Sequence, residues 1–333
     1  MVPVNTAAVF TAIPAWFKHA PADGLTLPDF VVPLFLFSLG LSASISFKAR
    51  FRERGYGKTL LHALVRSAVL FAFGSIGILL VDHSARWEIL QMLGATSLFS
   101  FFFLLIPPWP RLGAAALLLA GVEILRPLGL GSLMLAWYDT GIAGPWGTFS
   151  LSFFAITASA LGELMKDVSS EKRLVRSALF AGVQCGAGLL ALPLFPFSKH
   201  LVSLSYVLFT GGISSALLAL LVLAGEIWGL KPPVVGSMGR NALLLYMLHA
   251  LIGVGGQALL GNDIDAGLAW GVSFLVLGAC AVAAIVLDRK RVYVKLRKWR
   301  LRTAPVTRCA SGGIRQAVLV SRYPSGGASR GTV

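Results

Sequence analysis

The segment WFKHAPADGLTLPDFVVPLFLFSLG, at residues 16–40, sets one histidine, His19, against the start of a long apolar run. Histidine has an unperturbed pKa of about 6.5, so it can accept a proton near neutral pH as a general base does. A titratable side chain at the edge of a bilayer is costly to keep there, which favours a functional role. An interfacial histidine that only hydrogen-bonds a neighbouring loop explains the residue equally well.

Other polar side chains lie in or beside apolar runs. Asp29 stands where a helix should begin, and capping of free N–H groups is sufficient to explain its carboxylate. Lys199, Ser205 and Tyr206 lie in the segment FPFSKHLVSLSY, a turn that leads into an apolar run. Gln91 lies near the start of another run, where such residues mostly pair with a second helix and some line a cavity.

The segment SMGRNALLLYMLH places Asn241, Tyr246 and His249 in one predicted helix. Asn241 and His249 are eight residues apart, roughly two turns, so they should share a face. That face is either a polar packing seam or part of a substrate site. The chain has no Walker loop, no dinucleotide-binding glycine pattern, no GxSxG and no HExxH motif.

The composition indicates a polytopic membrane protein. Of 333 residues, 56% are hydrophobic and only 13% are charged, whereas soluble domains have about 25% charged residues; the mean hydropathy is +0.78. The net charge of +15 comes from short basic clusters between apolar runs, which argues against nucleic acid as a partner. Cys185, Cys280 and Cys309 lack metal-ligand spacing, so we expect neither a disulfide framework nor a metal site.

A membrane span needs about 20 apolar residues, and this criterion predicts an all-α bundle of about nine spans. The fourth and fifth are the weakest. The predicted spans are 29–47, 59–81, 88–106, 111–125, 147–165, 175–194, 202–225, 239–260 and 266–287.

The positions of Lys and Arg predict the orientation of these spans, since both residues accumulate on the cytoplasmic side. Basic clusters at 48–58, 166–176 and 289–298 follow the first, fifth and last spans. Nine alternating spans place all three clusters in the cytoplasm and His19 on the opposite side. We therefore expect a transmembrane domain over 1–287 and a basic, largely disordered cytoplasmic tail over 288–333.

Four segments resemble the heparan-alpha-glucosaminide N-acetyltransferase-like membrane acyltransferases, which are lysosomal in animals and widespread in bacteria. The first carries VN, HA, GLT, PD and VPLFLF in the order of that family. The second and fourth are similar to its Leu-Gln-Arg helix and its late Asn-Ala-Leu-x-x-Tyr helix, and the third to its Phe-Pro-x-x-Lys and Ser-Tyr-Val-Leu-Phe run. The segments are VNTAAVFTAIPAWFKHAPADGLTLPDFVVPLFLFSLG, EILQMLGATSLFSF at 88–101, FPFSKHLVSLSYVLFTGG at 195–212 and GRNALLLYMLH at 239–249.

The resemblance implies transfer of acetyl from cytoplasmic acetyl-CoA to an amino sugar or another envelope glycan across the bilayer, in a multi-pass protein of the bacterial inner membrane. It implies that His19 is the catalytic residue and that Asn5 is its neighbour in the site, donating to the developing oxyanion or orienting the acyl group. Whether His19 carries the acetyl group or acts only as a base is left open. Asp29, Gln91, Lys199, Ser205, Tyr206 and Asn241 are the further candidates for substrate or acetyl-CoA binding.

The chain also departs from the family pattern. Met92 replaces the Arg of Leu-Gln-Arg, and Pro21, Ala22 and Asp23 stand where a tryptophan is common. The segment MVPVNTAAVF is too short to cross a bilayer. It is interpreted as the end of a truncated first helix, with a helical stub on the membrane surface as the alternative. A transporter or flippase-like protein and a non-catalytic family member remain the rival functions.

Overall fold

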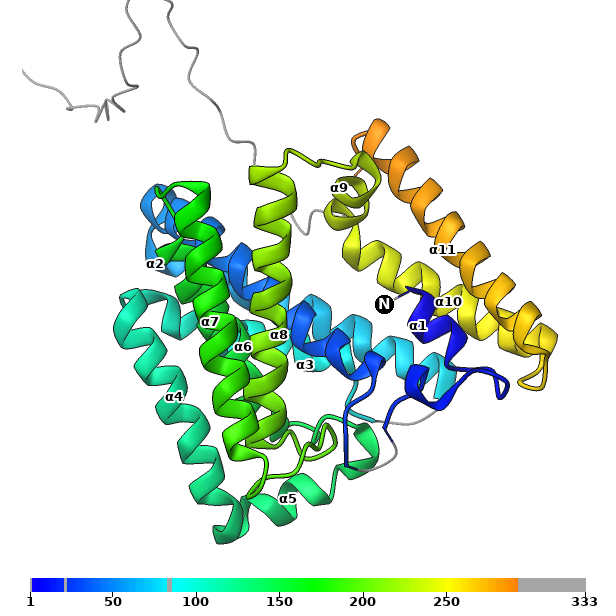
Figure 1. The fold of residues 1–333 in the computed structure, drawn as a ribbon, viewed down its shortest axis with the longest axis horizontal. Coiled ribbons are helices and arrows are strands. Elements are labelled where there is room, and N and C mark those ends of the chain that lie inside the picture. Colours follow the sequence, from blue (N-terminus) through cyan, green and yellow to red (C-terminus); the bar gives the residue numbers. More distant parts are fainter. Residues whose placement is uncertain (1, 21–22, 83–85, 293–333) are drawn as a thin grey trace, which may run out of the picture. The chain divides into compact units, whose positions relative to one another are not determined.

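The computed structural model describes residues 2–20, 23–82 and 86–292. These residues form an all-helical structure with no strands, which confirms the predicted fold class for the described part of the chain. They belong to one compact unit, Met1–Val294 (Figure 1). A second unit, Lys295–Val333, lies outside the described residues, as does the predicted disordered tail from residue 293 onward.

Eleven α-helices are found among the described residues, joined by short 3₁₀ and π turns. They are α1 (Val2–Ala7), α2 (Val31–Asp82), α3 (Ile89–Phe101), α4 (Pro108–Leu125), α5 (Gly131–Leu135), α6 (Gly147–Leu164), α7 (Ser170–Ala191), α8 (Leu204–Val222), α9 (Pro233–Arg240), α10 (Ala242–Leu260) and α11 (Ala266–Arg289).

Helix α2 is interrupted at Gly55, whose φ of 73° and ψ of 176° are not helical. A positive φ carries no penalty in glycine because it lacks a Cβ atom. Phe47, before the break, packs in one cluster with Leu60 and Ala63, after it, so the chain folds back at Gly55. The arms 31–54 and 56–82 therefore correspond to the first two predicted spans.

Six helical segments are long and apolar enough to cross a membrane, or seven if the bent pair α9 and α10 counts as one span. These numbers refer to the described residues only, and residues 27–79 count in them as a single segment. The predicted count of nine is thus not confirmed, although each predicted span contains a helix. Helix α3 has only 13 residues, about 20 Å of helix against a hydrocarbon core of about 30 Å.

Helix α6 lies at the centre of the main helix group, packed against α2, α3, α4 and α8 (Figure 1). The approach of α2 is close: a Cβ added to Gly40 would lie 2.2 Å from the Ala155 carbonyl oxygen. Small residues at helix contacts let backbones approach in membranes, where packing drives association. Helices α1 and α11 pack together beside α10, and this second group brings the N-terminal helix to the start of α2.

Candidate active site

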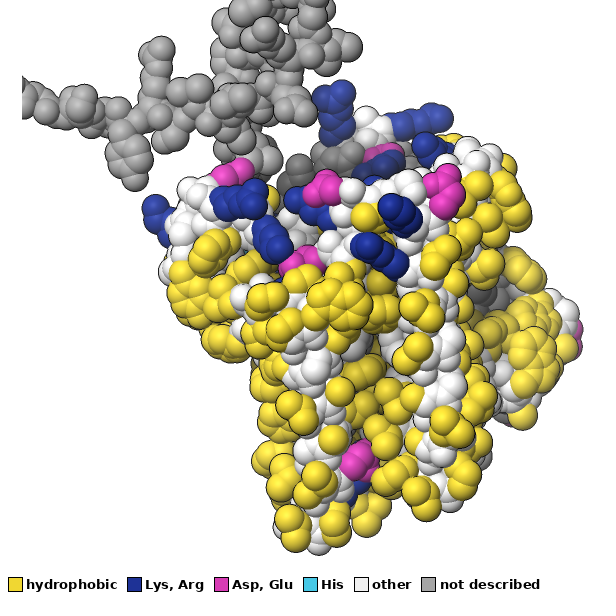
Figure 2. All heavy atoms as spheres, turned by 60° about the vertical axis from the view of Figure 1, so that its left-hand side comes forward, with side chains coloured by type: hydrophobic (Ala, Val, Ile, Leu, Met, Phe, Trp, Pro, Cys, Tyr) yellow, Lys and Arg dark blue, Asp and Glu magenta, His cyan; other side chains and the backbone are white. Residues whose placement is uncertain are grey.

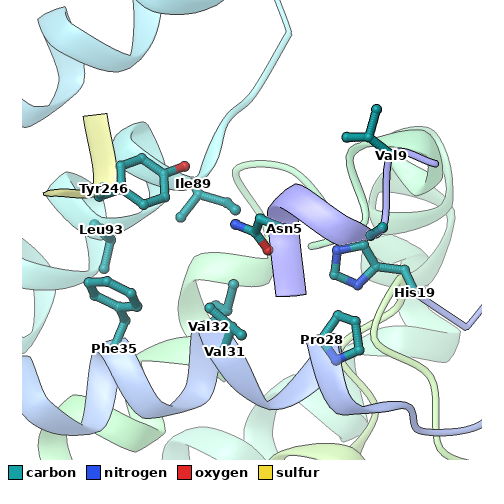
Figure 3. A pocket seen from close by; sticks show the side chains of 11 residues that line it. Asn5, Val9, His19, Pro28, Val31, Val32, Phe35, Ile89, Leu93 and Tyr246 are labelled. Atoms are coloured by element: carbon teal, nitrogen blue, oxygen red, sulfur yellow. The ribbon is translucent and has the colours of Figure 1, made fainter. Parts of the chain in front are cut away.

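A cavity of about 260 Å³ lies where α1, the start of α2, the start of α3 and α10 meet. Figure 3 shows Asn5 in its wall, with the His19 ring on one side and Tyr246 on the other. The remaining wall is mostly apolar. It consists of Ala8, Val9, Pro28, Val31, Val32, Phe35, Ile89 and Leu93.

His19 is held at this cavity by a carboxylate. Its Nδ1 lies 2.8 Å from Asp29 Oδ1, and the His19 side chain is 51% exposed while that of Asp29 is fully buried. A carboxylate can only accept a hydrogen bond, so Nδ1 carries the proton of the neutral imidazole and Nε2 keeps its lone pair. The ring is thus oriented as a general base requires.

The two carboxylate oxygens of Asp29 accept hydrogen bonds from different partners, one from the neighbouring turn and one from the basic side chains at the site. Oδ2 accepts from the Thr26 backbone N–H at 3.0 Å and from the Thr26 hydroxyl at 2.8 Å, which forms the predicted cap at the start of the helix. Oδ1 accepts from His19 and from Lys199 Nζ at 3.2 Å. The capping interpretation of Asp29 is therefore correct, and the same side chain also links His19 to Lys199.

The turn before α8 reaches Asp29 from the other half of the chain. Lys199 is buried there, and burial lowers the pKa of its ammonium group, while the attraction of Asp29 opposes that shift. The Tyr206 hydroxyl donates to the Asp29 backbone carbonyl at 2.9 Å. Ser205 does not touch Asp29, because its hydroxyl donates to the Phe195 carbonyl and holds the turn itself.

Asn5 is oriented by a second histidine. Its side-chain Nδ2 lies 3.3 Å from His249 Nε2, and His249 Nδ1 lies 3.1 Å from the Leu245 carbonyl oxygen. The carbonyl can only accept, so Nδ1 carries the proton and Nε2 must accept from the Asn5 amide. This contact joins residues 244 positions apart in the sequence.

None of the six further candidates for substrate or acetyl-CoA binding is among the described residues that line the cavity: Asp29, Gln91, Lys199, Ser205, Tyr206 and Asn241. Gln91 accepts from the Glu88 backbone N–H at 2.7 Å and donates to Ser75 at 2.8 Å, so it caps α3 and ties it to α2. Asn241 breaks the helix in which it was predicted: its φ of −116° and ψ of 21° separate α9 from α10. The two segments meet at 89°, so Asn241 and His249 do not share one helix face.

Sequence reasoning did not assign Tyr246 to the site, although it noted this residue in the same segment. Its ring makes edge contacts with Phe35 at 6.2 Å and His249 at 5.4 Å between ring centroids. The spacing of three residues from His249 puts both on one side of α10. The three-residue spacing of Tyr246 and His249 is therefore the feature of the sequence that could have assigned Tyr246 to the site.

The segment 126–148 packs beside the Lys199 turn. His200 stacks on Tyr138 with ring centroids 4.5 Å apart, and its ring nitrogens approach the Tyr138 carbonyl at 3.0 Å and the Ala20 carbonyl at 3.4 Å. His200 therefore connects this segment to the residue that follows His19.

A second, smaller hollow of about 50 Å³ lies farther along α2 and α3. Its basic side chains are Arg50, His62 and Arg66, contributed by both arms of α2, and no carboxylate is among its described lining residues. The hydroxyl-bearing residues Ser46, Thr59 and Ser97 also line it. Such a donor set suits an anionic group.

Residues 16–157 match the family model described as heparan-alpha-glucosaminide N-acetyltransferase, catalytic. The match confirms the resemblance predicted from the sequence over these residues, which include His19, Asp29 and Gln91. Asn5 and the segments after residue 157 lie outside it. No curated protein matches the chain.

Proposed function

From the match of residues 16–157 to this catalytic family, we propose that the protein is a membrane acetyltransferase. It moves acetyl from acetyl-CoA on the cytoplasmic side to an amino sugar or another envelope glycan on the periplasmic side of the inner membrane. The observation that carries the proposal is the cavity shared by Asn5 and His19, with His19 fixed by a buried carboxylate.

His19 acts as the general base of the transfer. The acceptor amine or hydroxyl attacks the thioester carbonyl carbon, the C–S bond breaks, and the departing sulfur takes up a proton as the CoA thiol. The proton lost by the acceptor goes to His19 Nε2 and from there to the sulfur. A positioned base typically contributes about 10²–10⁴-fold to such a rate.

In the proposed reaction the acyl donor, a substrate of the enzyme, lies along α2 and α3. Both hollows border these helices: Phe35 and Leu93 line the cavity, and Phe47 and Phe101 line the basic hollow. The separations correspond to about 12 Å along α3 and about 18 Å along α2 at 1.5 Å per residue. The flexible pantetheine arm of CoA suits that distance, with its phosphates on Arg50, His62 and Arg66.

The distribution of charge supports this direction of transfer. Figure 2 shows Lys and Arg side chains gathered at one end of the visible face and mainly apolar side chains over the rest. The loops expected in the cytoplasm contain the basic clusters 48–58 and 166–176. Arg50 and its neighbours belong to that side, which is where acetyl-CoA is available.

A transporter is the second candidate, because α9 and α10 form a bent pair at 89°. Broken helices that meet at a substrate site are typical of secondary transporters. The bend lies at Asn241, however, and the cavity is lined by Tyr246, farther along α10.

The test measures transfer of radiolabelled acetyl from acetyl-CoA to glucosamine by the purified full-length chain in detergent. We expect His19→Ala to abolish transfer and Lys18→Ala to leave it unchanged, since Lys18 Nζ donates to the Thr11 carbonyl at 3.0 Å. Equal transfer by His19→Ala and the unaltered chain would overturn the assignment of the base. Failure of the unaltered chain to bind acetyl-CoA or transfer its acetyl group would favour the transporter.

A further inference from the structure

Among the described residues that line the cavity, three have polar side chains: His19, Asn5 and Tyr246. The proposed function uses His19 as a base and needs a hydrogen-bond donor at the thioester carbonyl oxygen, where negative charge develops during attack. Asn5 and Tyr246 are the two candidates for this donor among the described lining residues. Their other contacts distinguish them.

Asn5 donates one of its side-chain N–H groups to another residue of the protein. His249 Nε2 accepts it at 3.3 Å, and the Leu245 carbonyl fixes the tautomer of His249 that makes this possible. The fixed amide leaves its carbonyl oxygen and its second N–H without a hydrogen bond to any residue that the structure describes. The carbonyl oxygen only accepts, so it suits the N–H or O–H of the acceptor substrate, while the second N–H can add to an oxyanion donor supplied by another residue.

Tyr246 differs from Asn5 in that its only polar side-chain group is a hydroxyl, which can donate a hydrogen bond. Its ring is held between Phe35 and His249, and its hydroxyl makes no hydrogen bond within the described part of the chain. In Figure 3 the hydroxyl points away from the Phe35 side of the cavity, and Asn5 lies between Tyr246 and His19. A phenol held by its ring, with its O–H free, is a preorganised donor.

We propose that Tyr246 is a catalytic residue that donates a hydrogen bond to the thioester carbonyl oxygen of the acyl donor. This inference rests on the proposed acetyl transfer. His19 takes the proton of the attacking N–H or O–H while the carbonyl π electrons move to the oxygen that Tyr246 binds. When the C–S bond breaks, those electrons re-form the carbonyl and the sulfur receives the proton from His19. The Tyr246 proton stays on Tyr246 throughout.

The experiment is Tyr246→Phe in the full-length chain, assayed for acetyl transfer over a range of acetyl-CoA and glucosamine concentrations. The substitution removes one oxygen atom and keeps the ring between Phe35 and His249. The matched control is Tyr56→Phe, which removes the same atom from a ring that contacts Phe51 and Phe101 near the break in α2. His19→Ala is measured alongside to test the proposed function separately.

We expect Tyr246→Phe to lower kcat about 10²–10³-fold with KM nearly unchanged, the loss typical of one oxyanion donor. The pH profile should keep the inflection of the unaltered chain, because His19 remains the base. An unchanged kcat, or a higher KM alone, would overturn the role of Tyr246 while leaving His19 as the base. Equal transfer by His19→Ala would instead overturn the assignment of His19 as the base, and failure of the unaltered chain to transfer acetyl would contradict the proposed function itself.

Discussion

Two buried carboxylates in this protein each join two basic side chains, yet their surroundings differ. Asp29 joins His19 and Lys199 beside the cavity. Glu163 joins Lys48 at 2.7 Å and Arg111 at 2.9 Å near the other end of the first arm of α2. The distance from Val31 to Lys48 along that arm is about 26 Å.

The partners of the two carboxylates account for the difference. Arg111 is 1% exposed and also donates to Ser159 and to the Leu104 carbonyl, both at 3.1 Å. Its guanidinium is therefore buried and hydrogen-bonded to other groups of the protein. His19 is 51% exposed, lines a cavity and keeps one ring nitrogen free of the carboxylate. The same pairing of a carboxylate with two basic side chains therefore fixes the fold at one end and leaves an imidazole accessible at the other.

The largest difference between the two carboxylates should appear in catalysis. Asp29→Asn replaces one carboxylate oxygen with an NH₂ donor, and the two Thr26 donors to Oδ2 favour the remaining oxygen at that position. The group facing His19 then no longer accepts from Nδ1, so kcat for acetyl transfer should fall about 10²–10⁴-fold, the range of a general-base contribution. The measurement is the rate per folded molecule, with the monodisperse fraction checked by size-exclusion chromatography. A kcat within about threefold of the original, against the 10²-fold minimum expected, would show that Asp29 only caps the helix.

Glu163→Gln should act on stability instead. It leaves Arg111 buried without its counter-charge, and breaking a buried pair typically costs about 3–5 kcal/mol. We expect a lower thermal unfolding midpoint in detergent and unchanged transfer per folded molecule. Glu53→Gln, an exposed carboxylate on α2, is the control and should leave the midpoint in place. A kcat loss like that of Asp29→Asn would contradict a purely structural role.

A smaller effect is expected where Tyr206 supports the Asp29 backbone. Tyr206→Phe removes the hydrogen bond to the Asp29 carbonyl, which should cost about 1 kcal/mol of stability. Because the Asp29 side chain keeps its contacts, the transfer rate should fall less than in Asp29→Asn. Thermal unfolding and the transfer assay on the same preparation measure both quantities. A rate loss as large as that of Asp29→Asn would mean that the backbone position of Asp29 limits catalysis.

The smallest effect concerns the pH dependence of stability at Lys199. Burial lowers its pKa in the folded state below the usual 10.5, so between these two pKa values the unfolded chain binds more protons than the folded one. The contribution of Lys199 to stability must then rise with pH through that window. Lys199→Met should remove this rise, measured as the unfolding midpoint at a series of pH values below 10.5. Parallel curves for both proteins would show that Lys199 titrates alike in both states.

Several features of the fold followed from local sequence. The apolar runs predicted helices in all the described regions where the structure has its long ones, since a backbone in lipid must satisfy its own hydrogen bonds. The family resemblance, carried by short segments around His19 and Gln91, is confirmed over residues 16–157. The predicted cap by Asp29 was also local, because it involves Thr26, three residues away.

What local sequence could not provide was long-range pairing. Gln91 was a candidate for substrate binding, but it accepts from the backbone of Glu88 and donates to Ser75 of α2, the pairing with a second helix expected of most such residues. Asn241 looked like a member of one helix face, but the helix bends there. A polar residue in an apolar run must find a partner, and its sequence neighbours do not reveal whether that partner is protein or substrate.

The sequence by itself determined the class of protein, its helical content and the histidine on which the proposed chemistry depends, because hydropathy and residue type are properties of each segment alone. Tertiary structure alone decided that Asp29 joins His19 to Lys199, that His249 orients Asn5 and that Tyr246 shares their cavity. These contacts join segments up to 244 residues apart. They exist only because packing of α1 near α10 and of the Lys199 turn against the start of α2 brings those segments together.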